Sequence, residues 1–252
     1  MHRAESRLKS WVESELKSTS CYQLKQKIAL DAASDLQLDT IDYAYSGLVS
    51  LCESIASFKR NGYSWGTVKA YYATFYLLRA YLAAKNVALF YRDSNYWYVE
   101  CIDSAAIVRA DTSTHVAVIG ALKKQSFSRN ILQEESGETI VDKLKHLREL
   151  ANYSNSPFSD PNPFPQIKTL SEGFDAKRIL GDYGRDPMTY AYTDGHALLA
   201  FPVFIWTKVK EERVDKEKPI AFNREQQKFL GQFLEQFNCK KDFERSLFCI
   251  SQ

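Results

Sequence analysis

Arg79 is the residue of this sequence whose side chain most clearly requires a charged or polar partner. It stands in an otherwise apolar stretch made of Leu77, Leu78, Ala80, Tyr81 and Leu82. A guanidinium in such surroundings needs a carboxylate, a carbonyl oxygen or a ligand to balance its charge. Asp42, Glu53 and Glu149 are candidate carboxylates. We therefore expect a salt bridge in a helical core or at a dimer interface, with phosphate or partner binding as the alternative.

Aromatic side chains between Phe90 and Tyr98 form a second candidate site. Proteins that bind single-stranded nucleic acid stack bases on such side chains. The same run is also typical of a strand that is buried or covered by a partner. Tyr96 and Trp97 are accordingly candidate nucleic-acid-binding or partner-binding residues.

Two histidines, His115 and His196, could each have either a functional or a structural role. His115 lies near an expected helix start, which favours capping or packing, with nucleic-acid or partner contact as the alternative. His196 follows Asp194 and Gly195, which favours a turn residue over a divergent functional histidine.

The sequence lacks the local motifs of several enzyme classes. It contains no glycine-rich phosphate loop, no GxSxG turn and no HExxH zinc motif. The five cysteines form no CxxC pair and no Cys/His metal-ligand spacing; they are Cys21, Cys52, Cys101, Cys239 and Cys249. We expect no cofactor, no metal, and neither nucleotide hydrolysis nor zinc-dependent hydrolysis.

The composition predicts a mainly helical cytoplasmic protein with reduced cysteines. Only 10 glycines and 7 prolines occur in 252 residues, which favours helices over a sheet-rich fold with many turns. Hydrophobic residues make up 45% of the chain, and the formal net charge of +2 neither demands nor excludes a nucleic-acid partner. The start of the chain does not resemble a signal peptide and no run of 18 apolar residues occurs, so we expect no membrane contact.

The stretch from Ser64 to Lys85 predicts a central helix, with Ser64 as its N-cap. Spacings of three and four residues predict two apolar faces. The first comprises Trp65, Val68, Tyr72, Phe75, Leu78 or Arg79, and Leu82, and the second comprises Tyr71, Tyr76 and Leu77. Ahead of it we expect helices at residues 3–18, at residues 21–35, and from Asp39 or Thr40 to about Arg60. The short connection to the central helix predicts an antiparallel pair.

After the central helix the pattern changes to a β-hairpin inserted at residues 87–102. Its strands are expected at 87–92 and 96–101, with turn chemistry in Asp93-Ser94-Asn95. Helices are expected again from Asp111 or Thr112 to about Lys124, and over residues 138–153. Residues 126–135 are expected to form a loop or a short helix.

Four prolines between residues 154 and 165 mark the clearest boundary in the chain. We expect a helical lead-in at 1–37, a bundle at 38–158 and a mixed C-terminal accessory region at 159–252. In the last region, residues 190–204 are apolar but interrupted by Gly195 and Pro202, and residues 208–218 are a solvated charge run. Asn223 caps a final amphipathic helix.

Three ordered segments resemble helices of the HEPN domain family. Ala70-Tyr71-Tyr72-Ala73-Thr74-Phe75-Tyr76-Leu77-Leu78-Arg79-Ala80-Tyr81-Leu82 is similar to the family's YYAxFxxxxALL helix. Thr114-His115-Val116-Ala117-Val118-Ile119 resembles its third helix, and Leu147-Arg148-Glu149-Leu150-Ala151-Asn152-Tyr153 resembles the LRxxADY segment of its last helix. The resemblance covers roughly residues 38–155. It implies an antiparallel helical bundle, frequent homodimerisation, and a role in prokaryotic defence or toxin–antitoxin systems.

The resemblance also implies a site residue, because many HEPN proteins are metal-independent ribonucleases with an Arg-x4–6-His motif on the last helix. Arg148 matches the arginine, but none of the seven residues after it is histidine, and Tyr153 stands where the histidine is first expected. A phenol with a pKa near 10 is a poor general base at neutral pH.

These observations favour a HEPN-like subunit that binds a partner protein, and possibly nucleic acid, without classical nuclease chemistry. The expected partner is a second copy or a neighbouring-gene product. One alternative is a divergent metal-independent endoribonuclease that uses Arg148 and Tyr153 as catalytic residues. Another is a structural adaptor with no RNA role.

Overall fold

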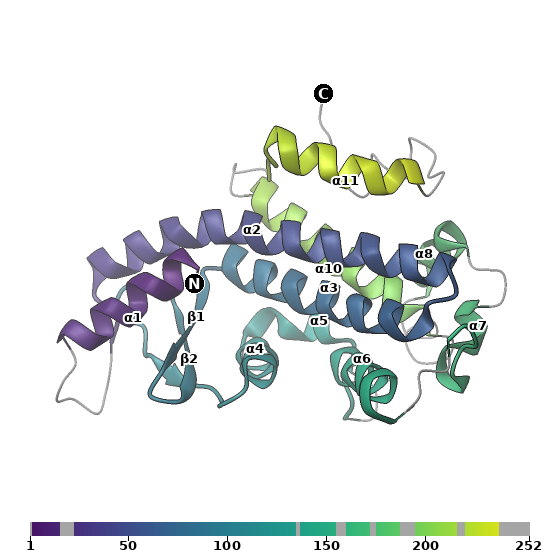
Figure 1. The fold of residues 1–252 in the computed structure, drawn as a ribbon. Helices are drawn as coiled ribbons and strands as arrows, with labels where there is room; N and C mark the ends of the chain where they lie inside the picture. The colour runs from purple at the N-terminus through teal and green to yellow at the C-terminus, as the bar shows by residue number, and fades with distance from the viewer. Residues whose placement is uncertain are drawn as a thin grey trace. The chain divides into compact units, whose positions relative to one another are not determined.

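The computed structural model describes residues 2–15, 23–134, 137–154, 160–171, 175–186, 195–215 and 220–236. This part of the chain is mainly helical and contains a small antiparallel sheet (Figure 1). The chain divides into two compact units, each assembled from three separate stretches. Unit 1 comprises residues 1–44, 78–131 and 208–220, and unit 2 comprises residues 45–77, 132–207 and 221–252.

Helix α2 (Gln26–Lys59) is one continuous helix, so the prediction of two helices at 21–35 and 39–60 is wrong. Its buried residues recur at three- and four-residue steps straight through the expected break, as Ala32, Leu36 and Thr40 show. Asp39 does not cap this helix. Its carboxylate accepts hydrogen bonds from the backbone N–H groups of Arg3 (3.0 Å) and Ala4 (2.9 Å), and so caps α1 (Arg3–Glu15).

Helix α3 (Tyr63–Ala84) confirms the predicted central helix but not its cap or its whole buried face. The carboxylate of Asp160 accepts from the backbone N–H groups of Tyr63 (2.8 Å) and Ser64 (3.1 Å), so Asp160 caps the helix in place of Ser64. Most predicted inward residues are buried; they are Val68, Tyr71, Phe75, Leu77, Leu78 and Leu82. Trp65 is 54% exposed, and Tyr72 and Tyr76 are half-buried.

The segments of α2 and α3 run antiparallel in each unit (Figure 1). In unit 2, Ser54 donates to the carbonyl of Gly66 (2.7 Å). A Cβ added to Gly47 would lie 2.6 Å from Cγ of Leu77, so this glycine permits a close approach of the two helices. In unit 1, the Arg79 guanidinium lies over the Tyr43 ring, 4.3 Å from its centroid.

The predicted hairpin is confirmed in unit 1. Strand β1 (Val87–Arg92) pairs antiparallel with β2 (Asn95–Glu100), and the register joins Arg92 to Asn95. The turn has two residues, Asp93 with φ 49° and Ser94 with φ 60°, which is the primed geometry that suits the twist of a hairpin. A third strand that was not predicted, β3 (Val108–Arg109), pairs with β2.

Helix α4 (Thr114–Lys123) begins at the N-cap Ser113, slightly later than predicted, because Asp111 accepts from the backbone N–H of Ser113 (3.0 Å) in a preceding turn. A short 3₁₀ turn and α5 (Arg129–Leu132) follow. In unit 2, α6 (Ile140–Glu149) continues into a π-helical turn at Leu150–Ser154, close to the predicted helix at 138–153.

The accessory region contains α7 (Lys168–Ser171), α8 (Ala176–Arg185), α10 (Ala197–Asp215) and α11 (Arg224–Gln236). Pro202 lies inside α10 and does not interrupt it. The prediction of a solvated charge run from residue 208 is wrong for Arg213, which is 4% exposed and donates to Gln37. Asn223 caps α11 as predicted, because its side chain accepts from the backbone N–H of Gln226 (2.9 Å).

Some predictions fall outside the described residues. They concern positions 16–18, 21–22, 155–159, 190–194 and 216–218, together with Cys21, Cys239 and Cys249. The described cysteines, Cys52 and Cys101, are both buried. Among the described helices, none combines the length and the apolar character that a membrane span requires.

Candidate functional sites

Helix α6 positions Arg148. A capping box fixes its start, because the Thr139 hydroxyl accepts from the backbone N–H of Asp142 and the Asp142 carboxylate accepts from the backbone N–H of Thr139, both at 3.2 Å. Leu144 and Leu147 are buried on the inner face. Arg148 follows Leu147 and is half-buried at the edge of that face.

The Arg148 guanidinium lies against Tyr71 of α3. Its central carbon is 5.1 Å from the centroid of the Tyr71 ring, within the range of a cation–π contact. One terminal nitrogen donates to Glu149 at 3.3 Å, a long bond to a carboxylate that is itself 44% exposed. The Nε–H of Arg148 is buried and meets no acceptor in the described part of the chain. The guanidinium therefore keeps hydrogen-bonding capacity that its own surroundings do not use.

Tyr71 itself is unsuited to proton transfer. Burial raises the pKa of Tyr71 to about 12, and the nearby Arg148 only partly opposes this rise. The hydroxyl is therefore neutral at physiological pH. Its ring provides a surface on which the Arg148 guanidinium packs.

Tyr153, the other residue of the predicted catalytic pair, lies in the π-helical turn at Leu150–Ser154. Its side chain is outside what the structure describes. Short π-helical turns occur frequently at functional sites. The catalytic role of Arg148 and Tyr153 stays a prediction.

Arg79 belongs to a separate group of side chains in unit 1. Its guanidinium lies over Tyr43, and burial raises the pKa of Tyr43 while the charge of Arg79 opposes that rise. Two of the three expected carboxylates have other partners: Glu53 pairs with Lys69, and Glu149 with Arg148. The aromatic ring thus supplies a contact that the apolar sequence around Arg79 did not reveal.

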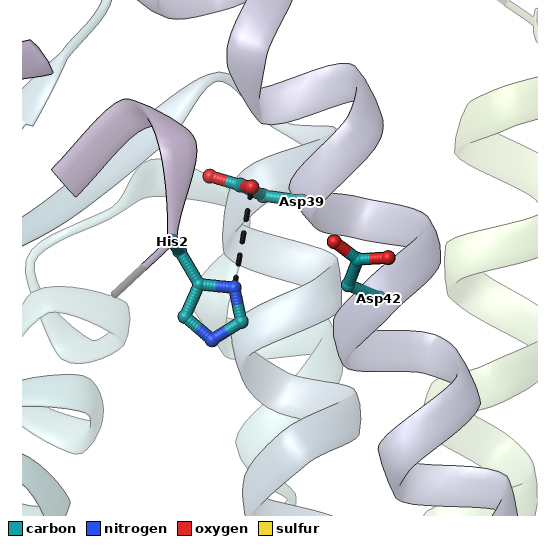
Figure 2. A group of neighbouring side chains, drawn as sticks. All are labelled: His2, Asp39 and Asp42. Atoms are coloured by element: carbon teal, nitrogen blue, oxygen red, sulfur yellow. Dashed lines mark ion pairs between the residues drawn. The ribbon is translucent and has the colours of Figure 1, made fainter. Parts of the chain in front are cut away.

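His2, Asp39 and Asp42 lie close together beside this group (Figure 2). Their ligand atoms are all within 4.8 Å of one another, the kind of spacing that a metal ion requires. However, the Arg3 guanidinium donates to both Asp39 (3.1 Å) and Asp42 (2.6 Å). The carboxylate of Asp39 is also occupied by the two N–H groups that it caps. We interpret this group as a helix cap with an ion-pair network, in which Arg3 already supplies the cation.

A small cavity adjoins the group. Its volume is about 10 Å³, and Asp39, Tyr43 and Arg79 contribute to its lining. Such a volume accommodates about one water molecule. It is too small for a substrate, so we place no catalytic centre there.

The hairpin separates the two predicted aromatic residues, because neighbouring residues of a strand point to opposite faces. On one face, the Tyr96 ring lies 4.9 Å from Tyr91, and its hydroxyl accepts from Thr114 at 2.6 Å. On the other face, Trp97 stands opposite Arg109 in the register. The Trp97 indole N–H donates to the backbone carbonyl of Arg92 at 3.3 Å. Tyr96 and Trp97 therefore do not form one continuous stacking surface.

The two candidate histidines lie at helix starts. His115 is half-buried in the first turn of α4, which the Tyr96–Thr114 hydrogen bond ties to the sheet. His196 is 3% exposed, and its backbone carbonyl accepts from the N–H groups of Leu199 (3.1 Å) and Ala200 (2.9 Å) at the start of α10. This favours a structural role for His196. The binding role of His115 stays a prediction.

Comparison with known proteins identifies no relative. No family model, no curated protein and no solved structure matches this chain.

Proposed function

We propose that this chain is a HEPN-like subunit of a prokaryotic defence or toxin-type system that acts by binding a partner protein, with nucleic acid as a second ligand. The resemblance of three ordered segments to HEPN helices suggests the assignment. The antiparallel pairing of α2 and α3 and the helix that carries Arg148 are compatible with a HEPN-like bundle at residues 38–158.

The single observation that supports a ligand at this site is the set of contacts made by the Arg148 guanidinium. This guanidinium packs on a tyrosine, and its one hydrogen bond among the described residues is a long one to the partly exposed Glu149. A terminal nitrogen held this weakly is suited to bind an added anion. A phosphate of RNA and a carboxylate of a protein both fit this chemistry. We favour RNA as the ligand of Arg148, because the HEPN resemblance assigns the RNA-directed arginine to this position.

The experiment is to incubate the purified protein with labelled RNA in the presence of a chelator, and to measure binding and cleavage separately. We expect binding without cleavage, and a dissociation constant for RNA that rises about tenfold in Arg148→Ala, because one charge-assisted contact is lost. Lys145→Ala is the control, since it removes a positive charge from a more exposed position of the same helix, which also pairs with Glu149. Equal effects of the two substitutions would argue against a specific role for Arg148.

A second candidate function, a divergent endoribonuclease, rests on the same arginine and on the π-helical turn that carries Tyr153. This function would be supported if the natural protein cleaves RNA in the presence of the chelator and both Arg148→Ala and Tyr153→Phe abolish the cleavage. Protein that neither binds nor cleaves RNA but associates with the product of an adjacent gene would favour the third candidate, a structural adaptor.

A further inference from the structure

We propose that Arg213 anchors a binding site for a carboxylate that belongs to another molecule. Arg213 lies in the last turn of α10, in the part of that helix that belongs to unit 1. Gln37 of α2 and the two residues that follow α3, Lys85 and Asn86, belong to the same unit and border the site. The proposal goes beyond the proposed function, since Arg148 belongs to unit 2.

The first observation is that Arg213 is a buried charge. Among the described residues, Arg213 is the buried cation and Asp39 the buried anion, with 4% and 1% exposure. Asp39 has a full set of partners, because it accepts from the Arg3 guanidinium and from two backbone N–H groups. A buried charge without such partners costs free energy of folding.

The partner of Arg213 is a neutral amide. Nη1 of Arg213 donates to the side-chain oxygen of Gln37, and the Gln37 amide donates in turn to Asn86 at 3.2 Å. The carboxylate next to it in the sequence, Glu212, pairs with Lys85. Because the charges of Glu212 and Lys85 cancel, this polar group keeps the one positive charge of Arg213.

The titration behaviour of Arg213 agrees with this geometry. Burial lowers the pKa of Arg213, and no carboxylate of the described residues opposes the shift. Arg3 and Arg7 show the opposite direction, because hydrogen bonds to Asp42 and Asp35 raise their pKa values. An arginine stays charged at physiological pH even when its pKa is lowered, so the positive charge of Arg213 persists.

The donors that Arg213 leaves unused match a carboxylate. Its Nε–H is buried and meets no acceptor within the described ranges. The Nε–H and one N–H of Nη2 point the same way from the guanidinium, and this fork fits the two oxygens of a carboxylate. Nη1, on the other side, is the nitrogen that binds Gln37. A carboxylate in the fork would satisfy the Nε–H and balance the charge together.

The side chains around the fork leave a short route from solvent. Gln37 and Asn86 are half-buried, and the side chain of Lys85 is 27% exposed. Partly exposed side chains change rotamer rapidly. A ligand therefore reaches Arg213 through side-chain rotation, without unfolding of a helix.

The charge of the group favours a carboxylate over a phosphate. A carboxylate is a monoanion and neutralises the single positive charge of Arg213. A phosphate monoester carries about −1.5 to −2 charges at pH 7, which would leave a negative charge buried. The carboxylate can belong to a small organic acid or to an acidic side chain of a peptide, and both present the same two oxygens.

The test follows the Nε–H group of Arg213 by NMR, with its resonance assigned from its loss in Arg213→Met. We expect titration with sodium acetate to shift this resonance in a saturable way, whereas sodium chloride at equal ionic strength should not. Gln37→Glu supplies a carboxylate from within the chain. Its dissociation constant for acetate should therefore be at least about tenfold higher than that of the natural protein. Lys208→Met is the matched control on α10, because Lys208 is partly exposed and pairs with Glu211 at 2.8 Å.

Thermal unfolding gives a second measurement. Acetate should raise the unfolding midpoint of the natural protein and of Lys208→Met above the values in chloride, but not that of Arg213→Met, because a ligand stabilises only the form that binds it. A peptide with one glutamate and an amidated C-terminus tests the polypeptide source. Tighter binding of this peptide than of acetate assigns the carboxylate to a polypeptide, and equal or weaker binding assigns it to a small acid.

Several results would overturn the proposal. These are an Nε–H resonance that responds to neither carboxylate, equal responses to acetate and chloride, tighter binding of inorganic phosphate than of acetate, and a Gln37→Glu variant that binds acetate like the natural protein. Arg148→Ala should keep the full response to acetate. The RNA assays therefore fail or succeed independently of this site.

Discussion

Asp39 and Asp160 each stabilise the start of a helix that lies far from them in the sequence. Asp39, 1% exposed, accepts from the first N–H groups of α1, and Asp160 does the same for α3. A carboxylate at a helix start satisfies free N–H groups and interacts favourably with the helix dipole. These two residues therefore link helix formation to tertiary structure.

Substitution of Asp160 measures how much its cap contributes to stability. Asp160→Ala should lower the free energy of unfolding by about 1 kcal/mol, the usual effect of losing an N-cap acceptor. Asp160→Asn retains an acceptor oxygen and should lose much less. Chemical denaturation of the two variants would check this, and equal losses would contradict the capping role.

His2 gives unit 1 a pH-dependent stability. Its ring lies 3.9 Å from that of Tyr43, and burial together with the charge of Arg79 lowers the pKa of His2 from its ordinary value of 6.5. Asp39 and Asp42 oppose this shift. Because the unfolded chain binds the proton more tightly, the free energy of unfolding should fall as the pH drops from 6.5 to the folded pKa.

Urea denaturation from about pH 7.5 to about pH 5.5 would measure this effect. The His2→Asn variant should lose less stability over the same range than the natural protein. Identical pH profiles for the two proteins would show that His2 does not carry the effect.

At the scale of elements, glycines control how closely α2 and α3 pack. A Cβ at Gly47 would lie 2.6 Å from Leu77, while a Cβ at Gly120 of α4 would have no atom within 4 Å. Gly47→Ala should therefore destabilise the protein by about 1–3 kcal/mol through overpacking. Gly120→Ala should stabilise it by up to about 1 kcal/mol through helix propensity. Thermal unfolding would check both, and a stabilising Gly47→Ala would contradict the close approach.

The elements show which kinds of structure were predictable from sequence. The β1–β2 hairpin was predictable because its turn residues are adjacent and its aromatic strands are local signals. Strand β3 was missed because two residues carry no pattern. Helix α2 was divided in error because Asp39 has the type of a cap residue, and only the position of α1 shows what it caps.

The candidate sites show the same limit at the level of side chains. The sequence identified Arg79 as a residue that needs a partner, and the HEPN resemblance pointed to Arg148. Neither could identify Tyr43 and Tyr71 as the rings on which these arginines pack. Trp65 has the spacing of the buried face of α3, and its exposure depends on what the other elements cover. The ion pairs around Asp39 had a local sequence signal in the two arginines Arg3 and Arg7. Arg3 pairs with Asp39 of α2, and Arg7 pairs with Asp35 of the same helix.

At the scale of the molecule, each unit is built from three separate stretches of chain. In unit 1, Lys85 pairs with Glu212, and Gln37 accepts from Arg213. A fragment that ends at residue 158, the boundary predicted from the prolines, would lack both contacts and would leave Lys85 without this carboxylate.

We therefore expect the fragment 1–158 to be less stable than the full chain by several kcal/mol, because several buried contacts are lost together. Hydrogen exchange and chemical denaturation of fragment and full chain would measure the difference. If residues 1–131 are as stable in the fragment as in the full chain, the end of α10 contributes little to the stability of unit 1.

The three-part construction of unit 1 also has a consequence for synthesis on the ribosome. Its first helix is synthesised long before Glu212 and Arg213, because the rest of unit 1 and most of unit 2 lie between them in the sequence. Domains whose residues are contiguous fold as they appear, whereas this unit must wait for the later stretch. During that interval Lys85 and Gln37 lack the partners that the later stretch supplies, and the buried Val209 is missing from the unit. Efficient production of this protein should therefore depend on molecular chaperones.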